Sequence, residues 1–132
     1  MVKTVSLGYF PKGLVEPYNR RFPVEFAESV IRDAETNGAD RVPNIHSFYG
    51  PLAEAMAEGE LEIRLTGIWK EKCITNSTGL SLQSGLGVIV PEALIWPLTG
   101  TQVPLDKMVQ FKFGHLNYEY RFDEGNHLFV PK

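Results

Sequence analysis

The alternation of apolar and polar residues predicts one strand with particular clarity, over residues 60–66. Leu61, Ile63 and Leu65 point to one face of this strand, and charged or hydroxyl side chains alternate with them. Such strict alternation is typical of a strand that buries one face and exposes the other. Trp69 keeps the parity of Leu61, and we therefore expect it to join the buried face.

Shorter alternating segments predict further strands near both ends of the chain. Residues 2–7 alternate in part and predict a short N-terminal strand. Near the C-terminus, residues 108–113, 118–122 and 127–130 alternate and are separated by turn-forming residues. This pattern is typical of an antiparallel meander of three strands.

A longer period predicts two helices in residues 23–59. The first covers residues 24–37, where apolar residues recur three and four positions apart and Gly38 supplies a C-terminal stop. The second covers residues 48–58, which are rich in strong helix formers. A β-rich segment, residues 60–132, follows these two helices.

Residues 73–105 are unusual because they carry one charged side chain, Glu92, in 33 residues. Glycines, prolines and uncharged polar residues interrupt the stretch too often for a membrane span. We interpret it as two or three strands that are covered on both faces. Residues 93–96 lie between Pro91 and Pro97 and are expected to form a strand at an edge of the sheet.

These elements predict a single α+β domain that spans residues 1–132. Two helices near the N-terminus pack on a mainly antiparallel sheet that ends in the three-stranded meander. Residues 1–22 supply the first strand and an extended arm. Because two helices cover only one face of the sheet, the sheet either closes into a small barrel or sandwich, or packs against another subunit.

Composition and charge support a globular protein and narrow its partners. Hydrophobic residues make up 43% of the 132 residues and charged residues 22%, which is typical of a folded domain. The net charge of −3 gives nucleic-acid binding little support. The single cysteine, Cys73, excludes an internal disulfide, and the N-terminus lacks the apolar stretch of a signal peptide. We expect a location in the cytoplasm or in an assembled particle.

Charge is unevenly distributed along the chain. Residues 1–22 sum to +3 and residues 23–66 to −6, while the remainder sums to zero. A basic arm ahead of an acidic helical segment can orient chains in an assembly.

No motif predicts catalysis, a cofactor or a metal centre. The three histidines lack the spacing of metal ligands, and no phosphate-binding glycine motif is present. Ser47 or Cys73 could form a nucleophile–base–acid set with His46 and Asp40 if the fold brought them together. Cys73 has no base beside it in the sequence and is expected to be a structural thiol.

The expected function is that of a non-catalytic structural or interaction protein that acts as an oligomer, such as a subunit of a viral particle or another large assembly. Its expected partners are further copies of itself or other protein subunits, with no membrane and no cofactor. The residues expected at the interface are Leu94, Ile95 and Trp96 at the sheet edge, with Arg20 and Arg21 in the basic arm.

Two alternatives remain open from the sequence. The first is a small hydrolase that uses His46 with Ser47 or nearby carboxylates. The second is a small protein inhibitor that binds its target through an acidic helical face.

Overall fold

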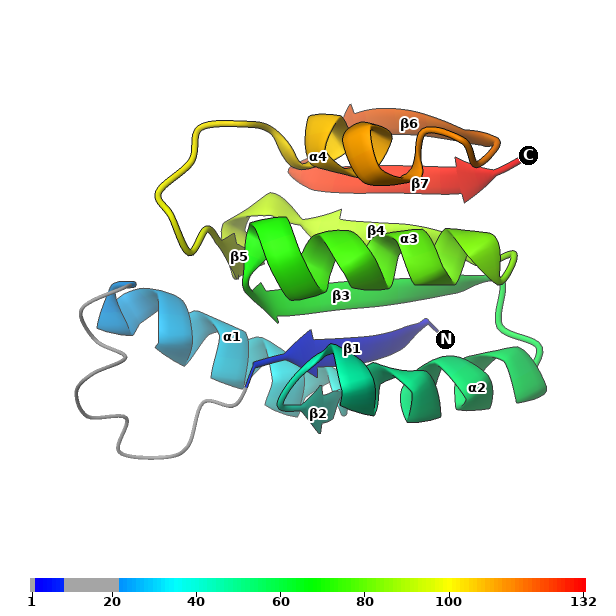
Figure 1. The fold of residues 1–132 in the computed structure, drawn as a ribbon. Coiled ribbons are helices and arrows are strands. Elements are labelled where there is room, and N and C mark those ends of the chain that lie inside the picture. The colour runs from blue at the N-terminus through cyan, green and yellow to red at the C-terminus, as the bar shows by residue number, and fades with distance from the viewer. Residues whose placement is uncertain (1, 9–21) are drawn as a thin grey trace.

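The computed structural model describes residues 2–8 and 22–132, which Figure 1 shows as a ribbon. Arg20 and Arg21 and most of the expected arm lie outside the described residues. The helices of the described part are α1 (Val24–Asn37), α2 (Tyr49–Ala57), α3 (Thr75–Gln83) and α4 (Leu105–Phe113). Its strands are β1 (Lys3–Leu7), β2 (Asp40–Val42), β3 (Glu62–Ile68), β4 (Gly87–Pro91), β5 (Ile95–Trp96), β6 (Tyr118–Asp123) and β7 (Asn126–Pro131).

The strands form one mixed sheet in the order β2-β1-β3-β4-β7-β6, with β5 beside the end of β3. β1 is parallel to β2 and β3, and β3 is parallel to β4 and β5. β7 is antiparallel to both β4 and β6. The α+β class is confirmed, but the expected mainly antiparallel sheet is wrong because β1 to β5 all run in one direction. Parallel neighbours need long crossovers, which α1, α2 and α3 provide.

Helices cover both faces of this sheet and are spread through the chain, not confined to its N-terminal part as expected. α2, α3 and α4 lie on one face, in front of the sheet in Figure 1, where they enclose the larger core. α1 packs on the opposite face, where Phe26 and Val30 meet Ile68. The sheet is open, with β2 and β6 at its edges. The expected barrel or sandwich is therefore not formed.

The charge-poor stretch contains a buried helix where strands were expected. α3 carries buried Thr and Ser residues, and three of their hydroxyl groups, those of Thr75, Thr78 and Ser81, bond to backbone carbonyl oxygens, whereas the hydroxyl of Ser77 has no protein partner. Thr78 donates to the carbonyl of Ile74 at 2.8 Å, and Ser81 donates to the carbonyl of Ser77 at 2.8 Å. These bonds satisfy the hydroxyls of Thr78 and Ser81 without water. A charged side chain at these buried positions would have no such partner, which explains why α3 lacks charge.

The expected three-stranded meander is also wrong, because its first member is the helix α4. Leu105 and Val109, four residues apart, are fully buried beneath this helix. The alternation that suggested a strand depends on Phe111, which is 90% exposed. The remaining pair, β6 and β7, forms a hairpin with a continuous antiparallel register.

β3 is the clearest strand, as predicted, but both of its faces are covered. Ile63 and Leu65 are fully buried in the larger core, whereas Leu61 precedes the strand and is 83% exposed. The alternation continues through Ile68, which lies on the α1 side of the sheet like Arg64. Trp69, the next residue, packs on that same side and does not join the face of Ile63 as expected.

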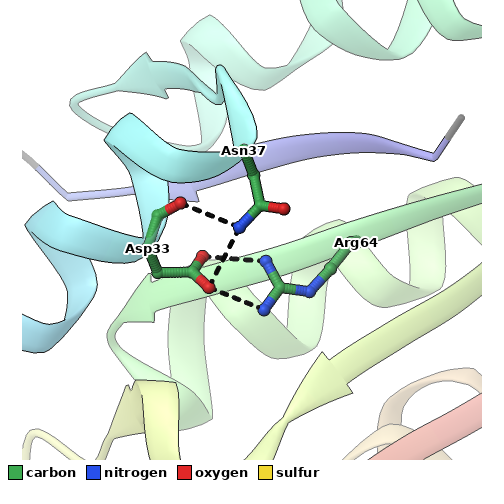
Figure 2. Close-up of polar contacts among 3 residues, drawn as sticks. All are labelled: Asp33, Asn37 and Arg64. Atoms are coloured by element: carbon green, nitrogen blue, oxygen red, sulfur yellow. Dashed lines mark hydrogen bonds and ion pairs between the residues drawn. The ribbon is translucent and has the colours of Figure 1, made fainter.

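An ion pair fixes α1 on the second face of β3, as Figure 2 shows. The Arg64 guanidinium donates to both carboxylate oxygens of Asp33, with both distances at 2.8 Å. The side-chain amide of Asn37 donates to the carbonyl oxygen of Asp33 at 2.9 Å. A two-pronged arginine–carboxylate pair is both strong and strictly oriented. The face of β3 that was expected to be solvated is therefore an interface with α1.

We predict that Gly67→Ala destabilises the protein far more than Gly85→Ala. Both glycines have positive φ values, 109° and 86°, but only at Gly67 would the added methyl group overlap the backbone of Leu7. Gly85 lies in open space, so its substitution costs only the conformational strain of about 1–2 kcal/mol. Gly67→Ala should cost about 4 kcal/mol or more. Urea unfolding measures both values, and equal losses would contradict the close approach of β1 and β3.

Candidate functional site

The carboxyl ends of β1 and β3 form the topological switch point of the parallel strands. The chain leaves β1 toward β2 on one side, and it leaves β3 toward β4 on the other. Gly8 follows β1 and Gly67 lies near the end of β3, and a side chain at either position would overlap the neighbouring strand. The two backbones can meet closely here because both residues are glycine. In open sheets of this kind, ligands bind outside the carboxyl ends of the strands at this point.

Hydrogen-bond donors gather after β2 at the same edge of the sheet. Val42, the last residue of β2, accepts a hydrogen bond from the backbone N–H of Gly8 at 2.9 Å. Asn44 then begins a continuous helical segment made of the 3-10 turn Ile45–Phe48 and α2. The side-chain oxygen of Asn44 accepts from the N–H groups of His46 and Ser47 at 2.9 and 3.2 Å. The positive end of this helical segment therefore lies at the carboxyl edge, and the His46 and Ser47 side chains are exposed there.

The carboxylate that follows β3 at this edge is already engaged by the protein itself. Glu71 accepts hydrogen bonds from the N–H of Leu98 at 2.7 Å and from the N–H and hydroxyl of Thr99 at 3.1 and 2.7 Å. Burial on its own raises the pKa of Glu71, but the hydrogen bonds from Thr99 and Leu98 outweigh it and hold that pKa below its usual value. Glu71 thus ties the segment after β5 to the end of β3.

A second carboxylate, Glu92, belongs to a chain of three hydrogen-bonded side chains beside β4. Glu92 follows β4 and bonds through Oε2 to Nε2 of His127 on β7. Nδ1 of the same ring lies 2.9 Å from the hydroxyl of Tyr120 on β6. The His127 side chain is 5% exposed, so the ring is enclosed by its two partners.

The pKa values of Glu92 and Tyr120, the two ends of this hydrogen-bonded series, are both shifted from their usual values. The hydrogen bond from His127 lowers the pKa of Glu92, and the nearby charge of Lys70 adds to this effect. Burial, with the charges of Asp106 and Glu92, raises the pKa of Tyr120. Glu92, as the carboxylate, accepts from Nε2–H, and Nδ1 shares a hydrogen bond with the Tyr120 hydroxyl. Both nitrogens of the buried ring therefore have a hydrogen-bond partner.

A cavity of about 350 Å³ lies between α4 and β6, next to the hydrogen-bonded side chains of Glu92, His127 and Tyr120. Asp106 and Lys107 line it from α4, and Tyr118 and Tyr120 line it from β6. Its polar lining contains both charge signs, so it favours no single class of ligand. The carboxyl edge carries the positive end of a helical segment and the exposed side chains of His46 and Ser47, and it is the better candidate site.

The residues expected at an oligomer interface are partly used by the protein's own core. Ile95 is 5% exposed and belongs to the larger core. Leu94 and Trp96 are half-buried and pack against the core beneath α1, where the Trp96 ring centroid lies 5.3 Å from that of Phe26. Trp96 therefore anchors α1 of its own chain, and Ile95 is a core residue.

The candidate hydrolase residues are not assembled into a catalytic set in the described structure. Within residues 2–8 and 22–132, no side-chain hydrogen bond joins His46 to Ser47, and both residues are exposed. Asp40 instead lies 3.2 Å from the ammonium group of Lys3. Cys73 is a free, half-buried thiol packed against the larger core.

Sequence reasoning missed His127 as the centre of a polar network. Its partner Glu92 lies 35 residues away, and no spacing rule connects them. One signal was available, because Glu92 is the only charge in a 33-residue stretch and such a charge needs a specific partner.

Comparison with known proteins adds no functional information, since no family model, curated protein or solved structure matches this chain. The described residues contain no cluster of three or more His, Cys, Asp or Glu side chains that could hold a metal ion. No helix among these residues has the length and apolar character needed to cross a membrane.

We predict that the charge of Glu92 stabilises the protein at neutral pH and ceases to do so in acid. Because its pKa in the folded protein is below the usual 4.5, its contribution is complete above pH 4.5 and is lost as the pH falls through the lower folded value. Glu92→Gln keeps an acceptor for His127 but removes the charge. Urea unfolding should therefore show a deficit for the variant at pH 7 that shrinks toward about pH 3.

The control for this experiment is Glu28→Gln, which changes an exposed residue on α1. It should follow the wild-type pH dependence closely. A deficit of Glu92→Gln that stays constant from neutral to acid pH would contradict the assigned ionisation.

Proposed function

We propose that this protein binds a small anionic molecule at the carboxyl edge of its parallel strands, between the ends of β1 and β3. The observation that carries the proposal is the strand order β2-β1-β3-β4, in which the chain turns to opposite sides after β1 and β3. Gly8 and Gly67 let the backbones of β1 and β3 meet closely at this point. Ligands of open sheets bind outside the carboxyl ends of the strands at such a switch point.

The balance of donors and acceptors at this edge favours an anion. The helical segment that begins after Asn44 presents its positive end, and His46 and Ser47 expose donor groups there. The two nearby carboxylates, Glu71 and Glu92, already accept hydrogen bonds from the protein and compete little for these donors. A carboxylate, sulfonate or phosphate group on a small molecule matches these donors.

The non-catalytic class expected from the sequence is retained in this proposal, with a small molecule as an additional partner. The hydrolase alternative loses support, since His46 and Ser47 act here as exposed donors and not as a base with its nucleophile. The Glu92–His127–Tyr120 chain has a structural role, because it joins the segment after β4 to the β6–β7 hairpin.

Binding of small anions tests the proposal directly. The probes are inorganic phosphate, sulfate, acetate and methanesulfonate, compared with tetramethylammonium chloride at equal ionic strength. We expect at least one anion to raise the unfolding temperature saturably; at a concentration 100 times its Kd, the gain in stability is about 2.7 kcal/mol. Amide NMR shifts should concentrate at Gly8, Ser47 and Gly67.

Ser47→Ala is the matched variant, and we expect it to weaken the binding of the anion that stabilises the wild type about tenfold, as loss of a hydrogen bond to a charged group does. Ser29→Ala removes a hydroxyl from α1 and should leave binding unchanged. If none of the four anions gives saturable stabilisation, or if the shifts gather at the cavity between α4 and β6, the proposed site is wrong.

A further inference from the structure

β6 forms an open edge of the sheet whose protection is limited to the charged side chains of Glu119, Arg121 and Asp123. All six of its residues pair with β7 in an uninterrupted register, and the strand contains no proline and no bulge. The opposite edge strand, β2, has three residues and is followed directly by Pro43. Natural proteins shorten or interrupt their edge strands to prevent pairing with other chains. β2 shows these features, and β6 does not.

The hairpin determines which backbone groups of β6 point outward. Its two-residue turn is Glu124-Gly125, with φ values of 50° and 79°, as in a type I′ turn. Such a turn is closed by a pair of residues that exchange hydrogen bonds, here Asp123 and Asn126. The bond from the N–H of Lys132 to the carbonyl of Asn117, at 3.0 Å, shows the same odd-numbered register at the other end of the hairpin.

The even-numbered residues therefore present unpaired backbone groups along the outer side of β6. In an antiparallel ladder, residues that exchange hydrogen bonds with one neighbour alternate with residues whose N–H and C=O point to the other side. Tyr118, Tyr120 and Phe122 are of the second kind. Each offers one donor and one acceptor to a further strand.

We propose that β6 pairs with β6 of a second copy of this chain, antiparallel, around a twofold axis at Tyr120. Tyr120 then exchanges hydrogen bonds with the Tyr120 of the other copy, and Tyr118 exchanges them with Phe122. Every outward-facing group of these three residues gains a partner. The two sheets become one continuous sheet across the axis.

Charge complementarity selects this register. Pairing around Tyr120 places Glu119 opposite Arg121 of the other copy, twice by symmetry, in the positions where antiparallel side chains are closest. Pairing around Arg121 would instead set Arg121 against itself and Glu119 against Asp123. Parallel pairing in register would set every charge against its own copy. Pairing around Phe122 would also set Arg121 against Asp123, but it would place Tyr120 opposite Glu124 in the turn and leave Tyr118 without a strand residue to pair with. The arrangement around Tyr120 opposes unlike charges and also pairs all three residues with outward-facing backbone groups.

Apolar exposure on and beside β6 points to the same partner. Phe122 is 52% exposed, and self-pairing covers it with Tyr118 of the other copy. Val130, next to Glu119 on β7, is 49% exposed on the face away from α4. Tyr118 also lines the cavity between α4 and β6, so the second copy lies at the rim of that cavity.

Charge reversal in sedimentation experiments tests the pairing. Wild-type protein should form a dimer that dissociates on dilution. Glu119→Arg and Arg121→Glu each create two like-charge pairs, and each should raise the dimer Kd at least tenfold. In an equimolar mixture of the two variants, arginines of one chain oppose glutamates of the other, and a heterodimer should form. The double variant Glu119→Arg/Arg121→Glu should also dimerise again.

Glu35→Arg and Arg32→Glu on α1 are the matched controls, since they change net charge equally at exposed positions. Both should dimerise as wild type does, and urea unfolding should show that all variants are folded. A wild-type monomer at high micromolar concentration would overturn the proposal and leave β6 as an edge for a different protein. A dimer that tolerates both single reversals, or a mixture of the two that stays monomeric, would also overturn it.

Discussion

The burial of β3 on both faces is the constraint on which the rest of the structure depends. Ile63 and Leu65 face the larger core, and any residue between them must then face α1. Arg64 occupies that position, and a partly buried arginine is stabilised by a well-oriented anionic partner. Asp33 supplies it through two hydrogen bonds, while Asn37 holds the Asp33 backbone (Figure 2). This pair sets the position of α1 on the sheet, and α1 in turn buries Ile68 and packs against Trp96.

The opposite face of β3 requires a helix without charge, and α3 meets this requirement with hydroxyl groups. Thr78 and Ser81 return their hydrogen bonds to the helix itself, which allows α3 to lie between the sheet and α4. Gly79 on α3 allows α4 to pack closely against α3, because a methyl group at this position would overlap the ring of Phe113 on α4. Placement of α4 then completes the cover of β7 and leaves β6 at the open edge.

The two surfaces proposed here are separated by the sheet itself. The anion site lies where β1 and β3 end, while self-pairing uses β6, with β4 and β7 between them in the strand order. A dimer formed through β6 therefore leaves both carboxyl edges accessible. The oligomeric character expected from the sequence survives as a proposal, but its contact moves from the segment around Trp96 to β6, since Trp96 packs against α1 of its own chain.

The sequence alone determined the features that depend on local pattern: helix α1 with its glycine stop, the strand around Ile63, the β6–β7 hairpin and the α+β class. Only the tertiary structure decided whether ambiguous segments became strands or helices. Residues 75–83 and 105–113 alternate in part, yet they are helices because the crossover between parallel strands and the cover of β7 require them. The partners of Glu92 and Arg64 could not be predicted from the sequence either. His127 lies 35 residues from Glu92 and Asp33 lies 31 residues from Arg64, so each pair forms only when the sheet and α1 assemble.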